Sequence, residues 1–192
     1  MRLLPATEYR RMPWKNGGGE TLEVAIGPPG APLDRFDWRV SLARVAVDGP
    51  FSRFPGIDRT LSIVQGPGLR LIVGAGRPMT LTPGSAPFTF PGDAAAEATL
   101  IDGPVMDLNV MTRRGAFRHQ VERLVVDGAA ELSSRSTITL LLPIDGALRI
   151  DGEASVGEVA AFDTLLISTP WRSLAVDSQL AVRLLRIDID GQ

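Results

Sequence analysis

Hydrophobic residues occur along this chain in short runs that alternate with polar positions. Segments such as WRVSLARV (38–45), LRLIVG (69–74) and EATLIDG (97–103) lie between glycine, proline and aspartate residues. Runs of about five to eight residues between such turn signals are typical of strands in a β-sandwich or barrel. Helical periodicity is weak, and only PATEYRRM (5–12) and part of FRHQVERL (117–124) favour short helices. The pattern therefore predicts an all-β protein with few short helices.

The order of these runs is repeated along the chain. Residues 59–73 resemble residues 136–151, because each segment contains two apolar runs separated by a short turn with glycine. Residues 90–111 resemble residues 162–189 in the same way. Two stacked jelly-roll barrels in one chain would produce this repeat, and a single irregular β-sandwich is the alternative.

The repeat also predicts the domain organisation. We expect an N-terminal barrel with a pocket at residues 1–115 and a mainly structural C-terminal barrel at residues 116–192. In the second half, the runs 160–168 and 180–189 are mainly apolar and show no polar constellation. The pattern leaves open whether strands are exchanged between the two barrels.

Composition excludes several classes of function. The 192 residues carry 20 basic and 22 acidic side chains, a net charge of -2, so no basic footprint points to nucleic acid. The chain has no cysteine, which excludes disulfides and thiolate metal sites. The N-terminus lacks the apolar segment of a signal peptide, and no stretch reaches the roughly 18 apolar residues of a membrane span. We therefore expect a cytoplasmic protein without a membrane partner.

Several short segments carry a family resemblance. They are PWKNGGG (13–19), GPFS (49–52), FPG (54–56) with the following Asp-Arg pair, and VMDLNVMTRRG (105–115). Together they resemble the HutD/Ves family over most of the first 115 residues, whereas the second half matches only in its pattern of strands and turns. The resemblance implies a bicupin, with two cupin-type jelly-roll barrels in one chain. It also implies an association with histidine utilisation in some bacteria and with stress response in others.

The usual metal site of cupins is not expected here. Such a site needs several neutral imidazoles that converge inside a barrel. This chain has a single histidine, His119, and no cysteine to replace the others. We therefore expect no metal and no cofactor. His119 follows a basic turn near the expected domain boundary, and we expect it at the surface or at an interface.

The segment WKNGGGET (14–21) is the first candidate for a binding site. Three successive glycines would let the chain follow the barrel rim and expose backbone N–H groups. Lys15 and Asn16 would add a positive charge and an amide at the same place, a combination that suits a carboxylate or a planar polar ligand. The alternative is a glycine-rich bulge in which Trp14 packs as a plug and Lys15 faces solvent.

Polar residues on three expected strands complete the candidate site. In WRVSLARV, Arg39 and Ser41 share one face, which lines a pocket if that face is directed inward. Arg59 is a second candidate for an inward guanidinium, and a ligand carboxylate could be its partner. Asp107 and Asn109 share a face of the run 105–113, although both residue types disfavour strands. We assign ligand contact to Asn109.

The two arginines have a simpler interpretation as well. Arg39 and Arg59 could form ordinary ion pairs with Glu20, Glu23 or Asp58. The sequence alone does not decide between ion pairing and ligand binding.

Three functions compete on this sequence. We favour a metal-independent protein that binds a small anionic metabolite, such as urocanate or formylglutamate, and that senses or limits flux through a pathway. An enzyme with Lys15 as base and Glu20 as acid is the second hypothesis, and an interaction module in a homodimer, joined by the glycine segment, is the third. The predicted ligand-binding residues are Lys15, Asn16, Arg39, Ser41, Arg59 and Asn109.

Overall fold

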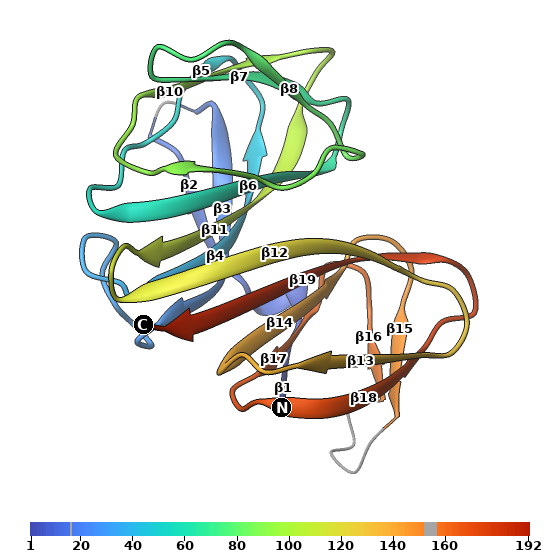
Figure 1. The fold of residues 1–192 in the computed structure, drawn as a ribbon. Coiled ribbons are helices and arrows are strands. Elements are labelled where there is room, and N and C mark those ends of the chain that lie inside the picture. Colours follow the sequence, from blue (N-terminus) through green and yellow to red (C-terminus); the bar gives the residue numbers. More distant parts are fainter. Residues whose placement is uncertain (16, 152–156) are drawn as a thin grey trace. The chain divides into compact units, whose positions relative to one another are not determined.

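The protein is built almost entirely of antiparallel β-strands (Figure 1). The computed structural model describes residues 1–15, 17–151 and 157–192. Within these ranges the helical content is one 3₁₀ helix, Ala6–Glu8. This confirms the predicted all-β class. None of the helices found in these ranges is long and apolar enough to cross a membrane.

One of the two expected helices is wrong, and the other is a single turn. FRHQVERL lies within β12 (Phe117–Val126), where half-buried Phe117 and His119 alternate with exposed Arg118 and Gln120. This period of two is that of a strand, and pairing within a sheet overrides weak helical propensity. In PATEYRRM, the 3₁₀ turn ends before β2 begins.

The described residues form two compact units, Arg10–Arg118 and Met1–Tyr9 with His119–Gln192. The boundary between Arg118 and His119 lies inside β12, a few residues beyond the expected boundary after residue 115. The first nine residues belong with the C-terminal part of the chain because β1 (Arg2–Leu4) pairs with β17 (Thr164–Ile167).

The unit Arg10–Arg118 is a sandwich of two sheets. The six-stranded sheet has the order β2-β3-β4-β11-β6-β9, and the four-stranded sheet has the order β5-β10-β7-β8. Apolar residues from both sheets, such as Leu61 and Val105 from the first and Leu71 and Ala98 from the second, form its buried core. The strands are β2 (Arg10–Pro13), β3 (Gly19–Gly27), β4 (Trp38–Val45), β5 (Gly49–Pro50), β6 (Ile57–Gln65), β7 (Leu69–Val73), β8 (Met79–Leu81), β9 (Phe88–Pro91), β10 (Ala96–Leu100) and β11 (Val105–Arg113).

The second unit is also a two-sheet sandwich. Its sheets have the orders β1-β17-β14-β19-β12 and β13-β18-β15-β16. Leu141 and Leu184 from the first sheet pack with Leu148 and Val176 from the second in the buried core. The remaining strands are β13 (Ala130–Ser134), β14 (Ile138–Pro143), β15 (Leu148–Asp151), β16 (Glu158–Val159), β18 (Trp171–Asp177) and β19 (Val182–Gly191).

The two units share one topology. If β4–β11 and β12–β19 are each numbered from one to eight, both units have one sheet with the order 1-8-3-6 and one with the order 2-7-4-5. Eight strands in two such sheets form a jelly roll, the architecture of cupins. The repeated segments of the sequence occupy equivalent strands, since β6 and β7 correspond to β14 and β15. The fold is therefore compatible with the predicted bicupin.

Candidate functional site

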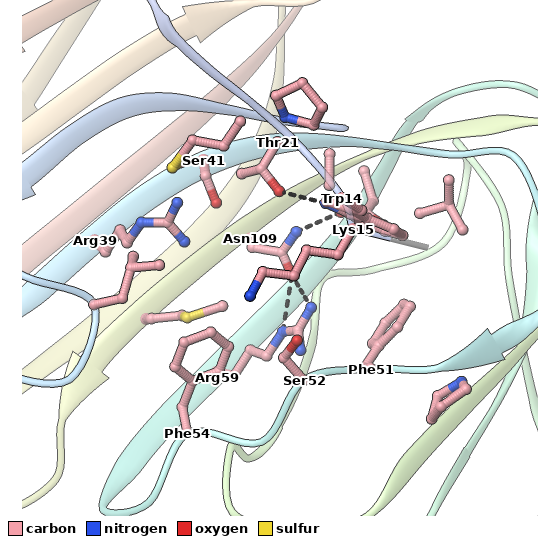
Figure 2. Close-up of a pocket in the computed structure, with 18 residues that line it drawn as sticks. Trp14, Lys15, Thr21, Arg39, Ser41, Phe51, Ser52, Phe54, Arg59 and Asn109 are labelled. Carbon is pink, nitrogen blue, oxygen red and sulfur yellow. Dashed lines mark hydrogen bonds between the residues drawn. The ribbon is translucent and has the colours of Figure 1, made fainter. Parts of the chain in front are cut away.

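A pocket of about 540 Å³ lies inside the unit Arg10–Arg118 (Figure 2). Its lining comes from β2, β3, β4, β5, β6 and β11 and from the loops that follow β2, β3 and β5. This volume lies within the range of about 300–1,000 Å³ that is usual for small-molecule sites. The lining combines aromatic rings, among them Phe51 and Phe54, with charged side chains, among them Arg39 and Arg59.

Strand register explains why the polar side chains converge. On β11, Asn109 lies opposite Ser41 of β4, and Met111 lies opposite both Arg39 of β4 and Arg59 of β6. Residues opposite each other in an antiparallel sheet point to the same face. The alternation expected for 38–45 and 105–113 is found, and its polar face is directed into the sandwich. Arg39, Ser41, Arg59 and Asn109 are all buried.

Arg59, Asn109 and Asp107 form a chain of hydrogen bonds. The Nε of Arg59 donates to Oδ1 of Asn109 at 2.8 Å, and Nη2 of Arg59 donates to the same oxygen. The Nδ2 of Asn109 in turn donates to Oδ1 of Asp107. The other oxygen of Asp107, Oδ2, is buried and has no hydrogen-bond partner in the part of the chain that the structure describes.

Arg59 also has aromatic neighbours. Its Cζ lies 4.6 Å from the ring centroid of Phe51 and 5.5 Å from that of Phe90. Contacts of this kind stabilise a cation that has been removed from water. They hold the guanidinium in place without using its N–H donors, so its remaining Nη1 group stays available for an acceptor.

Arg39 forms the ion pair that the simpler interpretation predicted. Its Nε lies 2.8 Å from Oε2 of Glu23, and both side chains are largely buried. Glu20 and Asp58 are engaged elsewhere, with Arg11 at 2.8 Å and with Arg114 at 2.8 Å. Arg39 therefore has a carboxylate partner, whereas the direct partner of Arg59 is the neutral amide of Asn109.

Burial shifts the acid–base properties of this cluster. Removal from water lowers the pKa of Arg59 to about 10, with nearby Asp107 opposing the shift and Arg39 adding to it. Burial raises the pKa of Asp107 to about 7, against the opposing effects of Arg59 and of the hydrogen bond from Asn109. Arg59 stays charged at neutral pH, and its positive charge and that of Arg39 disfavour each other.

The cluster has more positive than negative charge. Lys15, Arg39 and Arg59 all line the pocket, and Figure 2 shows their charged ends directed into it. Glu23 and Asp107 supply the negative charges. The excess is one positive charge when Asp107 is ionised and two when it is protonated. Such a site favours an anion.

Trp14, Lys15 and Thr21 of the glycine-rich segment line the pocket. The indole Nε1 of Trp14 donates to Oγ1 of Thr21 at 2.9 Å, and its backbone N–H donates to the carbonyl of Gly19 at 2.9 Å. Trp14 packs against the core of the unit, as the plug interpretation expected, while Lys15 is exposed and lines the pocket. A Cβ on Gly19 would lie 2.1 Å from the carbonyl oxygen of Arg44, so the glycine permits a close backbone approach.

Five of the six predicted ligand-binding residues line this pocket: Lys15, Arg39, Ser41, Arg59 and Asn109. The sixth, Asn16, lies outside the described residues. The sequence pattern placed Asp107 on the same strand face as Asn109, but Asp107 was not among the predicted ligand-binding residues. The signal was present, because an acidic residue on the inward face of an apolar strand must have a partner or a proton.

Three other expectations from the sequence can be compared with the structure. His119 belongs to the unit that contains His119–Gln192 and does not line this pocket. Among residues 1–15, 17–151 and 157–192, no group of three or more His, Cys, Asp or Glu could hold a metal ion. The carboxylate of Glu20, proposed as a catalytic acid, is bound by Arg11 and is not part of the pocket lining.

The jelly-roll topology defines a cupin-type fold, and its unit Arg10–Arg118 contains a pocket lined by buried polar side chains. The chain belongs to the HutD family, whose family model matches residues 6–184. This confirms the HutD/Ves resemblance of the short N-terminal segments.

Relatives agree with this assignment. The chain is 37% identical over 141 residues to an uncharacterized 21.2 kDa protein in the hutC 3' region of Pseudomonas putida, covering 73% of this chain and 72% of that protein. It is 42% identical over 118 residues to Protein Ves of Citrobacter koseri, covering 59% of this chain and 60% of Ves.

Solved structures show the same fold. A conserved protein of unknown function from Pseudomonas aeruginosa PAO1 superimposes with a TM-score of 0.89 at 31% identity, over 98% of both chains. HutD from Pseudomonas fluorescens SBW25 superimposes with a TM-score of 0.84 at 28% identity, over 100% of this chain and 98% of that one. Oxalate decarboxylase from Bacillus subtilis has a TM-score of 0.69 at 10% identity, over 99% of this chain and 77% of that one, a likeness of fold alone.

Proposed function

We propose that this protein binds a small carboxylate metabolite, without a metal, in the pocket of the unit Arg10–Arg118. The observation that carries the proposal is the pair of buried guanidinium groups, Arg39 and Arg59, that line one cavity. Glu23 and Asp107 balance these two charges only while Asp107 is ionised, and Lys15 adds a third positive charge to the pocket lining. A bound anion would supply the missing negative charge in a site where water screens little.

The arrangement of the N–H groups on Arg39 and Arg59 that stay free among the described residues favours a carboxylate over other small anions. Neither hydrogen bond of Arg59 uses Nη1, and the ion pair of Arg39 uses Nε. The outer edges of both guanidinium groups can therefore donate to a planar, two-oxygen acceptor. Lys15, which is exposed, provides a third cation in the pocket lining.

The relatives support a metabolite of histidine breakdown. One relative is described by its place in the hutC 3' region, and a solved relative is HutD. Urocanate and formylglutamate, products of histidine breakdown, both carry carboxylates. The competing enzyme hypothesis loses its proposed acid, because Glu20 is held by Arg11 away from the pocket. A sensing or flux-limiting role needs binding only.

The first test is a thermal-unfolding screen against histidine, urocanate, formiminoglutamate, formylglutamate, glutamate and divalent metals. A ligand at about a hundred times its dissociation constant adds roughly 2.7 kcal/mol of stability, which raises Tm by several degrees. We expect Arg59→Lys and Arg39→Ala to weaken binding about tenfold or more, because each removes charge-assisted hydrogen bonds. Arg44→Ala is the matched control, because Arg44 is exposed on the same strand as Arg39.

Two outcomes would contradict this function. If every acid leaves Tm unchanged while the protein is folded, the pocket does not serve small carboxylates. If only a divalent metal raises Tm, the site is a metal site that the histidine count failed to predict.

A further inference from the structure

The orientation of the Asn109 amide is fixed by its neighbours. Arginine has hydrogen-bond donors and no acceptor, so the group of Asn109 that faces Arg59 must be its oxygen. Its NH₂ group therefore faces Asp107 and donates to Oδ1. Since Oδ1 of Asp107 already accepts a hydrogen, a proton on this carboxyl would reside on the second oxygen, Oδ2.

The surroundings of Oδ2 disfavour a permanent negative charge. Asp107 is 1% exposed, and its Oδ2 has no partner among the described residues. The charged groups around the same cavity are Arg59 from β6, Arg39 from β4 with its partner Glu23 from β3, and Lys15 after β2. An incoming carboxylate would neutralise the cations that now stabilise the ionised form of Asp107, and it would add a like charge beside it.

We propose that Asp107 is a ligand-binding residue that holds the anion as a neutral acid, donating a proton on Oδ2 to an oxygen of the bound carboxylate. This inference rests on the proposed function of the pocket. The proton comes from solvent and adds to Oδ2, and no covalent bond in the ligand changes. Each carboxylate that binds thus brings up to one proton with it.

The sign of the pH dependence follows from this coupling. The carboxyl of Asp107 has a pKa raised by burial to about 7, and a bound anion raises that pKa further. Below pH 7 the proton is already in place, so affinity is highest there and changes little with pH. Above pH 7 the proton must be taken up on binding, and the dissociation constant rises by up to about tenfold per pH unit.

The experiment is isothermal titration of the full chain with formylglutamate, and separately with acetate, between pH 6 and 8.5. Carboxyls of both probes are ionised throughout this range, so any proton taken up belongs to the protein. Each titration is repeated in two buffers of different ionisation enthalpy, which gives the number of protons bound. We expect proton uptake to approach one near pH 8.

Asp107→Asn is the informative variant, because asparagine mimics the neutral acid. Its oxygen can accept from Asn109, and its NH₂ can donate to the ligand in place of the Oδ2 proton. We expect this variant to bind the probes at pH 8.5 at least tenfold more tightly than the wild type, with no proton uptake and a flat pH profile. Asp102→Asn, an exposed carboxyl of the same unit, should behave as the wild type.

Different results of these experiments would contradict the role of Asp107 and the carboxylate function on which it rests. Binding of formylglutamate without proton uptake, or weaker binding by Asp107→Asn, would mean that Asp107 acts as an ionised acceptor and would overturn the inference alone. Failure of both probes to bind the wild type at pH 6 would overturn the inference, and failure of every acid in the thermal screen as well would overturn the carboxylate function. Proton uptake by the wild type is measured without any variant, so poor folding of Asp107→Asn cannot decide the result.

Discussion

Asn109 connects two charged groups that lie in the interior of one sandwich. Its oxygen accepts from Arg59 and its nitrogen donates to Oδ1 of Asp107, so a single neutral side chain links the two groups. A direct ion pair between a buried arginine and a buried aspartate would gain Coulomb energy. It would also use the donors of the one group and the acceptors of the other for that pair alone. The intervening amide instead leaves Nη1 of Arg59 and Oδ2 of Asp107 free to meet a third group.

Removing this amide should destabilise the protein. Asn109→Ala leaves a buried guanidinium and a buried carboxyl without their hydrogen bonds, and we expect a loss of about 2–4 kcal/mol in the free energy of unfolding. Urea denaturation measures this loss. Ser52→Ala is the control, because Ser52 lines the same pocket but is exposed. Equal stability of the two variants would show that the hydrogen-bond chain contributes little.

At the level of single residues, the sequence identified the arginines and Asn109 but not their partners. Arg39 pairs with Glu23, as the simpler interpretation allowed, and Arg59 does not pair with Asp58. Both arginines looked alike in the sequence because each follows the alternation of its strand. Which acid lies nearby depends on the register between strands, and that register is not local information.

At the level of elements, Gly19, the third glycine of the glycine-rich segment, permits a close approach between two strands. β3 begins at Gly19, directly beside the backbone of β4, where a Cβ would meet the carbonyl oxygen of Arg44 at 2.1 Å and the ring of Trp14 at 3.1 Å. The contact with a backbone atom cannot be relieved by a rotamer change. The start of β3 and the position of Trp14 are therefore coupled.

Gly19→Ala should disturb this edge of the pocket. We expect a loss of about 1–3 kcal/mol in the free energy of unfolding, because the added methyl group overpacks the start of β3, together with a change in tryptophan fluorescence as Trp14 moves. Gly84→Ala is the matched control, because a Cβ there meets only Thr82 Oγ1 at 3.9 Å. Wild-type stability and fluorescence in Gly19→Ala would mean that the backbone shifts at no cost.

Elements were predicted well where turn signals flank an apolar run and poorly where they do not. The equivalent pairs β6–β7 and β14–β15 were recognised from their shared pattern of two runs and a glycine turn. Part of the segment 117–124 favoured a short helix because its charges obscure the alternation of Phe117, His119 and Val121. Pairing within the sheet decided the conformation of this segment, and that pairing cannot be recognised from the neighbouring residues in the sequence.

At the level of the whole molecule, the first nine residues contribute to a unit formed mostly by the last part of the chain. β1 extends the sheet next to β17. The hydroxyl of Tyr9 donates to the carbonyl of Phe162 at 2.8 Å and shares a hydrogen bond with Thr164 at 2.7 Å. Leu4 and Tyr9 are both buried. Residues far apart in sequence therefore stabilise the same sandwich.

A chain without residues 1–9 should lose stability in that unit first. The loss of two buried side chains and one edge strand should lower its free energy of unfolding by at least about 3 kcal/mol. Hydrogen exchange should become faster in β14 and β17 while β4 and β11 of the other unit keep their protection. Tyr9→Phe, which removes only the hydroxyl, should have a smaller effect of about 1–2 kcal/mol. Unchanged exchange in β17 after the truncation would contradict this assignment.

The sequence by itself determined the all-β class, the repeat of strand and turn patterns, the HutD/Ves resemblance and which polar residues share one face of a strand. These properties depend on the alternation of neighbouring residues and on glycine and proline at turns, which act over a few positions. Only the tertiary structure decided which unit residues 1–9 join, which carboxylate pairs with each arginine, and that Asp107 keeps one buried oxygen without a partner among the described residues. These features depend on strand register and on burial between sheets, which bring together residues tens of positions apart and set the cost of a charge by its distance from water.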